Sequence, residues 1–210
     1  MDKKGVVVLD FDGTIADAEE VMLRIYEPLA DRHGWPKLTK REYYRLKKGS
    51  PREIMHWAGI KLWQVPKLLR LGRAEYKKHA GEIKLFRGMP EVLDRLAEDR
   101  DVYILSSNER ETVRKILKNN KLKAKVTIMH GSPLFGKDKA IKKLLKLGYE
   151  RKLSWMIGDE IRDMEAGKKA RVNTIGVIWG LQSEAGIKKA GPDHIAKKPD
   201  DILKFIYNKQ

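Results

Sequence analysis

Short apolar runs, rich in β-branched residues, recur along the chain and predict buried strands, because strands covered on both faces are hydrophobic throughout. They are Gly5–Asp10, Val102–Ser106, Val126–Met129, Leu153–Ile157 and Thr174–Ile178. From the second run onward, segments with apolar residues three and four positions apart lie between them and predict amphipathic helices. These are Glu91–Glu98, Arg110–Lys118, Lys139–Leu147 and Ile161–Ala170. This alternation predicts an α/β fold with a parallel sheet, and it places ligands at the carboxyl ends of the strands.

The interval between the first two strands departs from this alternation, because about ninety residues separate them. Most of the interval is patterned as helices, with sequence-level capping boxes at Thr39–Glu42 and Ser50–Glu53. Such a segment is too long for a simple crossover and is large enough for a small lid. We therefore predict a core formed by residues 1–16 and 87–210 and an inserted helical cap formed by residues 17–86.

Composition removes several classes of protein from consideration. The chain has 210 residues, of which 41% are hydrophobic, and this excludes an intrinsically disordered protein. The apolar runs are far shorter than the ~18 residues of a membrane span, and the first residues lead into a strand and not into a signal peptide. We therefore expect a cytoplasmic protein with no membrane association. Cysteine is absent and the histidines lack metal-ligand spacing, so any metal site must be built from carboxylates.

The charge balance is strongly basic, with 45 Lys and Arg against 29 Asp and Glu and a formal net charge of +16. Such an excess would suit nucleic acid. The basic residues are spread over nearly every segment, however, and this favours the ion-pair-rich surface of a thermophile's protein. We therefore regard nucleic acid as an unlikely partner.

Two aspartates close the first predicted strand, in the segment Asp10-Phe11-Asp12-Gly13-Thr14. Strand alternation places Asp10 and Asp12 on the same side, with Phe11 opposite, and Gly13 allows a sharp turn beyond them. A calcium loop does not fit, because its fifth and twelfth positions would be Thr14 and Val21. An acidic strand-to-turn cluster without a catalytic role is the remaining alternative.

A second pair of aspartates follows the fourth predicted strand, in Gly158-Asp159-Glu160-Ile161-Arg162-Asp163. Asp159 and Asp163 are four positions apart and share a face if a helix begins here. Acidic residues also favour helix N-termini for electrostatic reasons alone. Together with Asp10 and Asp12, however, these carboxylates provide the hard oxygen donors that Mg²⁺ prefers.

The remaining polar candidates follow the second and third predicted strands. Ser106 ends the second strand, and if Asn108 with Glu111 caps the next helix, the Ser106 hydroxyl is left free for a phosphate oxygen. Lys137 stands where the third strand's loop enters a helix, and Lys139 is an alternative to it as the lysine that binds phosphate.

Taken together, these motifs resemble the haloacid dehalogenase superfamily: an Asp-x-Asp-Gly-Thr strand end, a serine after the second strand, a lysine, and Gly-Asp-x-x-x-Asp. The resemblance runs from Val6 to about Ile202 and includes Trp179-Gly180. It implies a Rossmann-like three-layer core, and the pattern is most similar to phosphoglycolate phosphatase-type members with a helical cap. Arg171 departs from the pattern, because relatives often have glycine there.

The resemblance also implies a mechanism. Asp10 would be the nucleophile that forms an aspartyl-phosphate, and Asp12 would protonate the leaving oxygen and then deprotonate water. Magnesium would be held by Asp10, the Asp12 main-chain carbonyl and Asp159, with Asp163 in support. Ser106, the backbone near Ser107 and Lys137 would hold the phosphoryl oxygens.

Several alternatives remain open on the sequence alone. Asp12 disfavours carbon-halogen cleavage, because dehalogenases resemble Asp-x-Tyr at this place. A sugar phosphomutase would share every motif, and a basic nucleic-acid-binding module with a vestigial site is the competing class. The expected substrate is a small phosphorylated metabolite, either phosphoglycolate-like or a sugar phosphate, with Arg45, Lys48 and Arg52 as candidate specificity residues in the cap. The oligomeric state stays open.

Overall fold

A computed structural model describes residues 4–49, 51–131 and 136–207 of the chain. Within this described part, six parallel strands form one sheet in the order β5-β4-β1-β6-β7-β8. Their bounds are β1 Val6–Asp10, β4 Asp101–Ser106, β5 Val126–His130, β6 Trp155–Gly158, β7 Asn173–Val177 and β8 His194–Ala196. The central strand β1 pairs with β4 and β6, so the segment that ends at Asp10 lies in the middle of the sheet.

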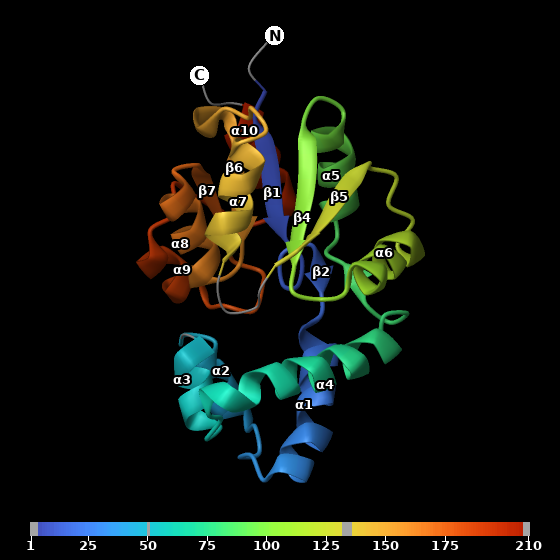
Figure 1. Cartoon of the computed structure of the whole chain (residues 1–210), viewed down its shortest axis with the longest axis vertical. Helices are drawn as coiled ribbons and strands as arrows, with labels where there is room; N and C mark the ends of the chain where they lie inside the picture. The colour runs from blue at the N-terminus through green and yellow to red at the C-terminus, as the bar shows by residue number, and fades with distance from the viewer. Residues whose placement is uncertain (1–3, 50, 132–135, 208–210) are drawn as a thin grey trace.

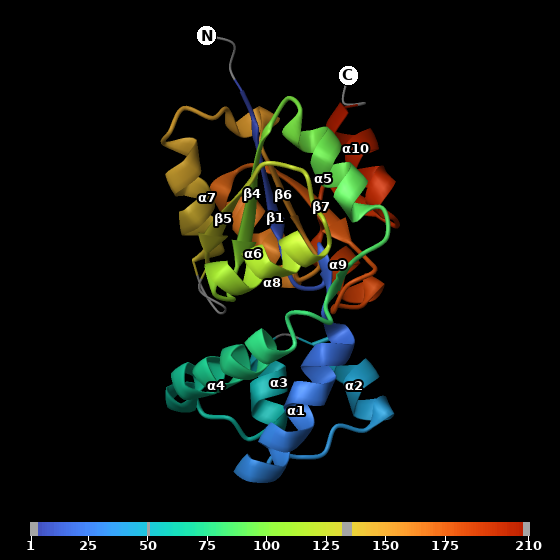
Figure 2. The same ribbon diagram turned by 90° about the vertical axis from the view of Figure 1, so that its right-hand side faces the viewer.

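Helices cover both faces of this sheet. They are α5 Met89–Ala97, α6 Arg110–Asn119, α7 Lys137–Leu145, α8 Ile161–Ala170, α9 Glu184–Ala190 and α10 Pro199–Tyr207. One buried cluster joins the sheet to α5, α6 and α10, and a second joins it to α7 and α8. Figure 2 shows α7 on one side of the sheet and α5 and α10 on the other. The predicted three-layer α/β core is confirmed.

Side-chain alternation along β1 assigns residues to the two faces. Val7 and Leu9 belong to the cluster under α5, α6 and α10, whereas Val6 and Val8 belong to the cluster under α7 and α8. All four are at most 1% exposed. Burial of an apolar side chain of this size is worth about 1.5–3 kcal/mol, so this strand is fixed firmly in register.

Between β1 and β4 the chain leaves the sheet and returns to it. The short strands β2 (Ala16–Asp17) and β3 (Lys84–Leu85) pair antiparallel, and between them lie α1 Glu19–His33, α2 Lys40–Leu46, α3 Pro51–Trp57, a 3-10 turn Leu62–Gln64 and α4 Val65–Lys78. We call residues 17–86 the helical insertion. The carboxyl ends of the strands point toward it (Figure 1). Its role as a separate cap domain stays a prediction.

Some local predictions are confirmed and others lie outside the described residues. The Thr39 capping box is present, since the Thr39 hydroxyl accepts from the Glu42 amide at 3.2 Å and the Thr39 amide donates back to the Glu42 carboxylate. The capping box predicted at Ser50 involves a residue outside the described part. Arg171 ends α8 with φ of 58°, a left-handed conformation that explains why glycine would suit this position.

In the described part of the chain, helices are too short or too polar to cross a membrane.

Candidate active site

The turn after β1 brings its two aspartates to the edge of the sheet that faces the helical insertion (Figure 1). Phe11 is fully buried in the cluster under α5, α6 and α10, so the backbone directs Asp10 toward the α7 and α8 side. Gly13 has φ of 80°, and a Cβ there would stand 2.2 Å from an Asp159 oxygen. The glycine therefore permits both the turn and the close approach of Asp159.

Lys137 is the counter-ion of this site. It is the first residue of α7, directly after Gly136, and it is only 6% exposed. Its Nζ lies 2.9 Å from Asp10 Oδ1 and also contacts Asp163 Oδ1. Burial alone would lower the pKa of the Lys137 ammonium, but the two carboxylates hold that pKa above its usual range. Lys139, the alternative, is exposed, so the geometry favours Lys137 for contact with the site.

Three carboxylates come together around Lys137, and one of them is not in the predicted set. Ligand oxygens of Asp10, Glu160 and Asp163 lie within 4.8 Å of one another. Burial raises the pKa of Asp163, and the neighbouring charges of Asp10 and Glu160 add to that rise although Lys137 opposes it. Repelling oxygen donors at this spacing suit a hard divalent cation such as Mg²⁺.

Asp159 is placed differently from the expectation. α8 begins at Ile161 with Glu160 as its N-cap residue, so Asp159 precedes the helix and does not share a helix face with Asp163. The condition for a shared face, a helix that begins at Asp159, is therefore not met, and the Asp163 side chain instead caps α8 by accepting from the Glu160 backbone amide. The Asp159 carboxylate accepts from the Thr14 hydroxyl at 2.8 Å and from the Leu181 amide at 2.7 Å. Burial raises its pKa well above the usual value, and each oxygen keeps a further lone pair, so Asp159 stays a predicted metal ligand.

Asp12 is held by two side chains that sequence reasoning did not assign to the site. The Tyr76 hydroxyl, from α4 in the helical insertion, donates to Asp12 Oδ1, and the Asn108 amide donates to Oδ2 at 2.7 Å. Burial, reinforced by the charge of Asp10, raises the pKa of Asp12 to about 7 despite the Tyr76 hydrogen bond. A carboxyl group with this pKa can give and take a proton near neutral pH.

The loop after β4 corrects one prediction. Glu109, not Asn108, is the N-cap residue of α6, and its side chain makes no cap hydrogen bond. The Asn108 side chain does not cap the helix but donates to Asp12. Ser106 is 1% exposed, and its hydroxyl oxygen accepts from the Asn108 backbone N–H at 3.0 Å. Ser107 follows and is half-buried. The hydroxyl hydrogen of Ser106 stays available for an acceptor such as a phosphoryl oxygen.

The predicted specificity residues lie apart from these groups. Arg45, Lys48 and Arg52 are exposed. A pocket of about 300 Å³ lies between the helical insertion and the core, and Lys47, not these three residues, is among those that line it. Their part in specificity stays a prediction.

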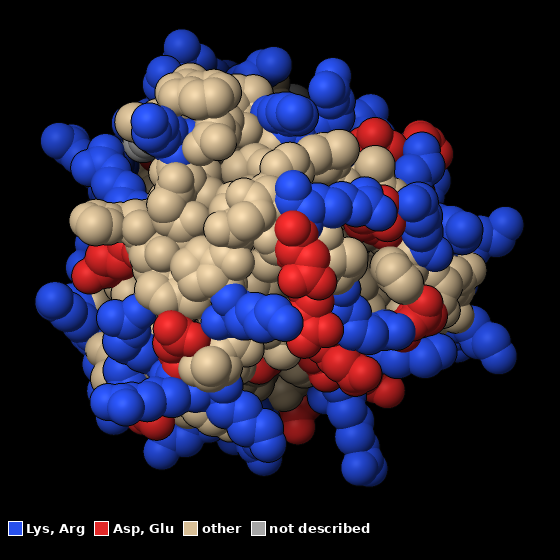
Figure 3. Space-filling model, turned by 90° about the horizontal axis from the view of Figure 1, so that it is seen from below, with Lys and Arg blue, Asp and Glu red and all other residues tan. Residues whose placement is uncertain are grey.

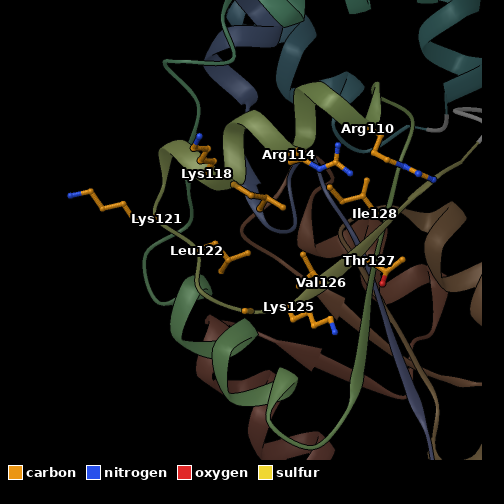
Figure 4. A pocket seen from close by; sticks show the side chains of 11 residues that line it. Arg110, Arg114, Lys118, Lys121, Leu122, Lys125, Val126, Thr127 and Ile128 are labelled. Carbon is orange, nitrogen blue, oxygen red and sulfur yellow. The ribbon is translucent and has the colours of Figure 1, made fainter.

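A larger groove lies between α6 and the edge strand β5. It is lined by Arg110, Arg114, Lys118, Lys121 and Lys125 over an apolar floor. Figure 4 shows these side chains spreading in different directions, so they do not converge on one anion. On the face of the helical insertion, Lys and Arg are interspersed with Asp and Glu (Figure 3). This distribution disfavours a continuous nucleic-acid-binding surface.

Gly180 supports the site through close backbone contact. A Cβ at this position would stand 2.3 Å from the Gly13 carbonyl oxygen and 2.4 Å from Asp159 Cβ. We therefore expect Gly180→Ala to displace Asp159 and to lower the unfolding free energy by about 1–3 kcal/mol, measured by urea denaturation. Gly72→Ala is the matched control, because nothing lies within 4 Å of its added Cβ in α4 and a helical alanine stabilises by up to ~1 kcal/mol. Equal stability of the two variants would contradict this account.

The parallel sheet and the carboxylates at its strand ends define an α/β enzyme with a candidate cation site. The family model for haloacid dehalogenase-like hydrolases matches residues 7–177, and the chain belongs to that family. The predicted family and the enzyme class of hydrolase are thereby confirmed.

Individual relatives match the chain over nearly its whole length. A phosphoglycolate phosphatase of Synechococcus elongatus is 28% identical over 203 residues, which cover 95% of this chain and 96% of that protein. The pyrophosphatase PpaX of Bacillus velezensis is also 28% identical, with 96% of each chain covered. A solved haloacid dehalogenase-like family hydrolase from Streptococcus pneumoniae superposes with a TM-score of 0.77 at 22% identity, covering 98% of this chain and 99% of that one.

Proposed function

We propose that this chain is a magnesium-dependent phosphomonoester hydrolase that acts through an aspartyl-phosphate on a small phosphorylated metabolite. The observation that carries the proposal is the pairing of two unlike carboxyl groups at the end of β1. Asp10 lies 2.9 Å from the Lys137 ammonium, whereas Asp12 has a pKa raised to about 7. One group is thus suited to attack as an anion, and the other is suited to carry a proton.

The proposed hydrolysis has two steps, formation and hydrolysis of the aspartyl-phosphate. An Asp10 carboxylate oxygen attacks phosphorus, the bond between phosphorus and the ester oxygen breaks, and that oxygen takes a proton from Asp12. Water then attacks the phosphorus of the aspartyl-phosphate, Asp12 accepts a proton from it, and inorganic phosphate leaves with Asp10 restored. Lys137 and the Ser106 hydroxyl would bind the phosphoryl oxygens in both steps.

Magnesium fits the donor set of this site. Asp10 and Asp163 of the predicted set lie with Glu160 so that oxygens of the three are within 4.8 Å of one another. Asp159 and the Asp12 carbonyl are the other ligands predicted from sequence. When bound, the cation neutralises charge on the phosphoryl group and on the carboxylate that attacks it. The Asp10, Glu160 and Asp163 oxygens are close enough to repel one another when ionised, and a bound divalent cation would relieve that repulsion.

The test is release of inorganic phosphate from a panel of phosphomonoesters with and without magnesium. We expect activity with Mg²⁺, loss of at least ~95% of it in excess chelator, and recovery when Mg²⁺ is restored, since carboxylate sites bind this cation reversibly. Activity that persists unchanged in chelator would contradict the magnesium dependence. Absence of phosphate release from every ester would contradict the phosphatase function itself.

Phosphoglycolate and sugar phosphates are the substrate types predicted from sequence, and names of relatives add pyrophosphate to the list. A phosphomutase would differ only in the acceptor of the phosphoryl group, and it stays the alternative activity. A cytoplasmic location and a thermophilic origin stay predictions. The contact between Lys137 and Asp10, with Asp12 intact beside them in the same turn, disfavours a nucleic-acid-binding module with a vestigial site.

A further inference from the structure

The pocket between the helical insertion and the core is walled by aromatic and aliphatic side chains. Tyr26 of α1, Tyr43 of α2 and Trp57 of α3 line it together with Leu46 and Ile54. We call this space the aromatic pocket. Among the described residues, α2 has no fully buried side chain, although Tyr43 and Leu46 point to this space. The apolar faces of these helices therefore meet a space of about 300 Å³ and not a filled core.

The polar atoms of the aromatic side chains are already satisfied elsewhere. The Tyr26 hydroxyl donates to the Pro36 carbonyl at 2.6 Å, and the Trp57 indole donates to Glu42 at 3.2 Å. The Tyr43 hydroxyl donates to Glu19. The rings of Tyr26 and Trp57 are stacked with centroids 6.3 Å apart. These hydrogen bonds fix the rings so that carbon, not a polar group, faces the pocket.

The charges of the pocket do not suit a second anion. Among the described lining residues Lys47 is the one cation, and its ammonium lies 3.0 Å from the Glu19 carboxylate. Glu160 also lines the pocket and pairs with Arg162. Two carboxylates against one paired lysine leave no cation for a carboxylate or a second phosphate on the substrate, and an unpaired buried charge is costly.

The pocket adjoins the reacting groups. Glu160 belongs both to its lining and to the carboxylate cluster with Asp10 and Asp163. Gln182 anchors the loop after α2 over the core, because its side-chain amide donates to the Gly49 carbonyl at 2.6 Å while its oxygen accepts from the Ile161 amide at 3.1 Å. A substrate with its phosphoryl group at Asp10 therefore has the aromatic pocket beside it for the rest of the molecule.

We propose that the aromatic pocket receives the leaving group, and that the preferred substrates are phosphomonoesters of uncharged, ring-bearing alcohols. This inference rests on the proposed phosphatase function and narrows its substrate class. It disfavours phosphoglycolate and pyrophosphate, because each presents a second anion to a pocket whose lysine is already paired. Apolar pockets with few polar groups are typical of sites for organic ligands.

The test compares kcat/KM with Mg²⁺ for benzyl phosphate, ethyl phosphate and 2-phosphoglycolate. All are esters of primary alcohols, which keeps intrinsic leaving-group differences small. Burial of the ring in the pocket favours its ester, so kcat/KM for benzyl phosphate should exceed that for ethyl phosphate by about 10- to 100-fold and should also exceed that for 2-phosphoglycolate. Equal or better hydrolysis of 2-phosphoglycolate would overturn the inference and leave the phosphatase function standing.

Variants locate the preference in the pocket. Trp57→Ala should remove most of the advantage of benzyl over ethyl phosphate, so that kcat/KM falls by at least about fivefold more for benzyl phosphate than for ethyl phosphate, because the lost indole contacts the ring. Trp63→Ala is the matched control, since Trp63 is 75% exposed and outside the pocket lining, and it should change neither value. A fall of the same size for both esters in Trp57→Ala would overturn the assignment.

A second variant covers the case in which Trp57→Ala fails to fold. Ile54 lines the pocket and is 40% exposed, so Ile54→Lys is tolerated sterically and adds a cation there. It should shift the ratio of 2-phosphoglycolate to benzyl phosphate by at least about fivefold toward 2-phosphoglycolate. An unchanged ratio in folded Ile54→Lys protein would contradict the inference.

Binding measurements distinguish failure of this inference from failure of the proposed function. Benzylphosphonate and phosphonoacetate cannot be hydrolysed at an ester bond, and calorimetry with Mg²⁺ measures their affinities whether or not the protein turns over. If benzylphosphonate binds more tightly than phosphonoacetate, and Trp57→Ala reduces this difference, the aromatic pocket is supported. Absence of ester hydrolysis alongside this result would refute only the phosphatase function. Tighter binding of phosphonoacetate refutes the aromatic pocket alone.

Discussion

Asp10→Asn should lower the rate of phosphate release by at least ~10³-fold, because an amide oxygen is a poor nucleophile and the proposed covalent step depends on the Asp10 carboxylate. The variant keeps the size of the side chain and leaves Lys137 paired with Asp163, so we expect it to fold. The measurement is kcat with saturating magnesium, with circular dichroism to verify the fold. Full activity in Asp10→Asn would show that another group attacks phosphorus.

Asp17→Asn is the matched control for that experiment. Asp17 lies at the end of β2, only a few residues further along the chain, and its side chain is exposed. The same chemical change there should leave kcat within about twofold, since surface substitutions away from special features have small effects. Comparison of the two variants distinguishes loss of the nucleophile from a general loss of negative charge near the site.

Lys137→Met should destabilise the metal-free protein by about 3–5 kcal/mol, because it leaves Asp10 and Asp163 buried without their counter-ion. This loss is a large share of a typical unfolding free energy of about 5–15 kcal/mol. The measurement is urea unfolding in chelator. Because burial raises the pKa of Asp163, that carboxyl becomes neutral as the pH falls, so the loss should be smaller at pH 5 than at pH 8. Magnesium should restore part of the lost stability.

Lys139→Met tests the same substitution two residues further along α7. Lys139 is exposed, so its loss should change the unfolding free energy by less than about 0.5 kcal/mol at either pH. The pair of variants also decides which lysine serves the active site. An equal effect of both substitutions would indicate that the contact between Lys137 and the carboxylates adds nothing to stability.

Much of the fold follows from sequence because the central strands are covered on both faces. β1, β4, β6 and β7 lie inside the sheet, and their predicted bounds agree with the structure within one or two residues. The apolar run at the edge strand β5 is predicted equally well. The edge strand β8 has only three residues, His194–Ala196, and its first two are half-buried, so it lacks an apolar run of sufficient length. Helices α9 and α10 after β7 were likewise outside the predicted elements.

The site is predictable as far as it depends on motifs along the chain. Asp10, Lys137 and Asp163 come into contact, and each belongs to a recognised motif. Tyr76 does not, because its hydroxyl reaches Asp12 from α4, 64 residues away, and nothing local marks it. Glu160 stood beside Asp159 in the sequence, but its part in the cluster depends on the helix starting at Ile161, which periodicity does not fix.

The antiparallel pair of β2 and β3 has a consequence for how such a protein can be altered. Ala16 is paired with Leu85 and Asp17 with Lys84, so the chain leaves and rejoins the sheet at adjacent points. Two neighbouring backbone crossings can be bridged by a tight turn, and β1, the strand that ends at Asp10, makes its sheet contacts with β4 and β6 without the helical insertion. At the level of the backbone the insertion is thus an exchangeable module: exchange of its helices between homologues would transplant a binding preference onto the same sheet, provided that the incoming helix keeps the tyrosine hydroxyl that donates to Asp12.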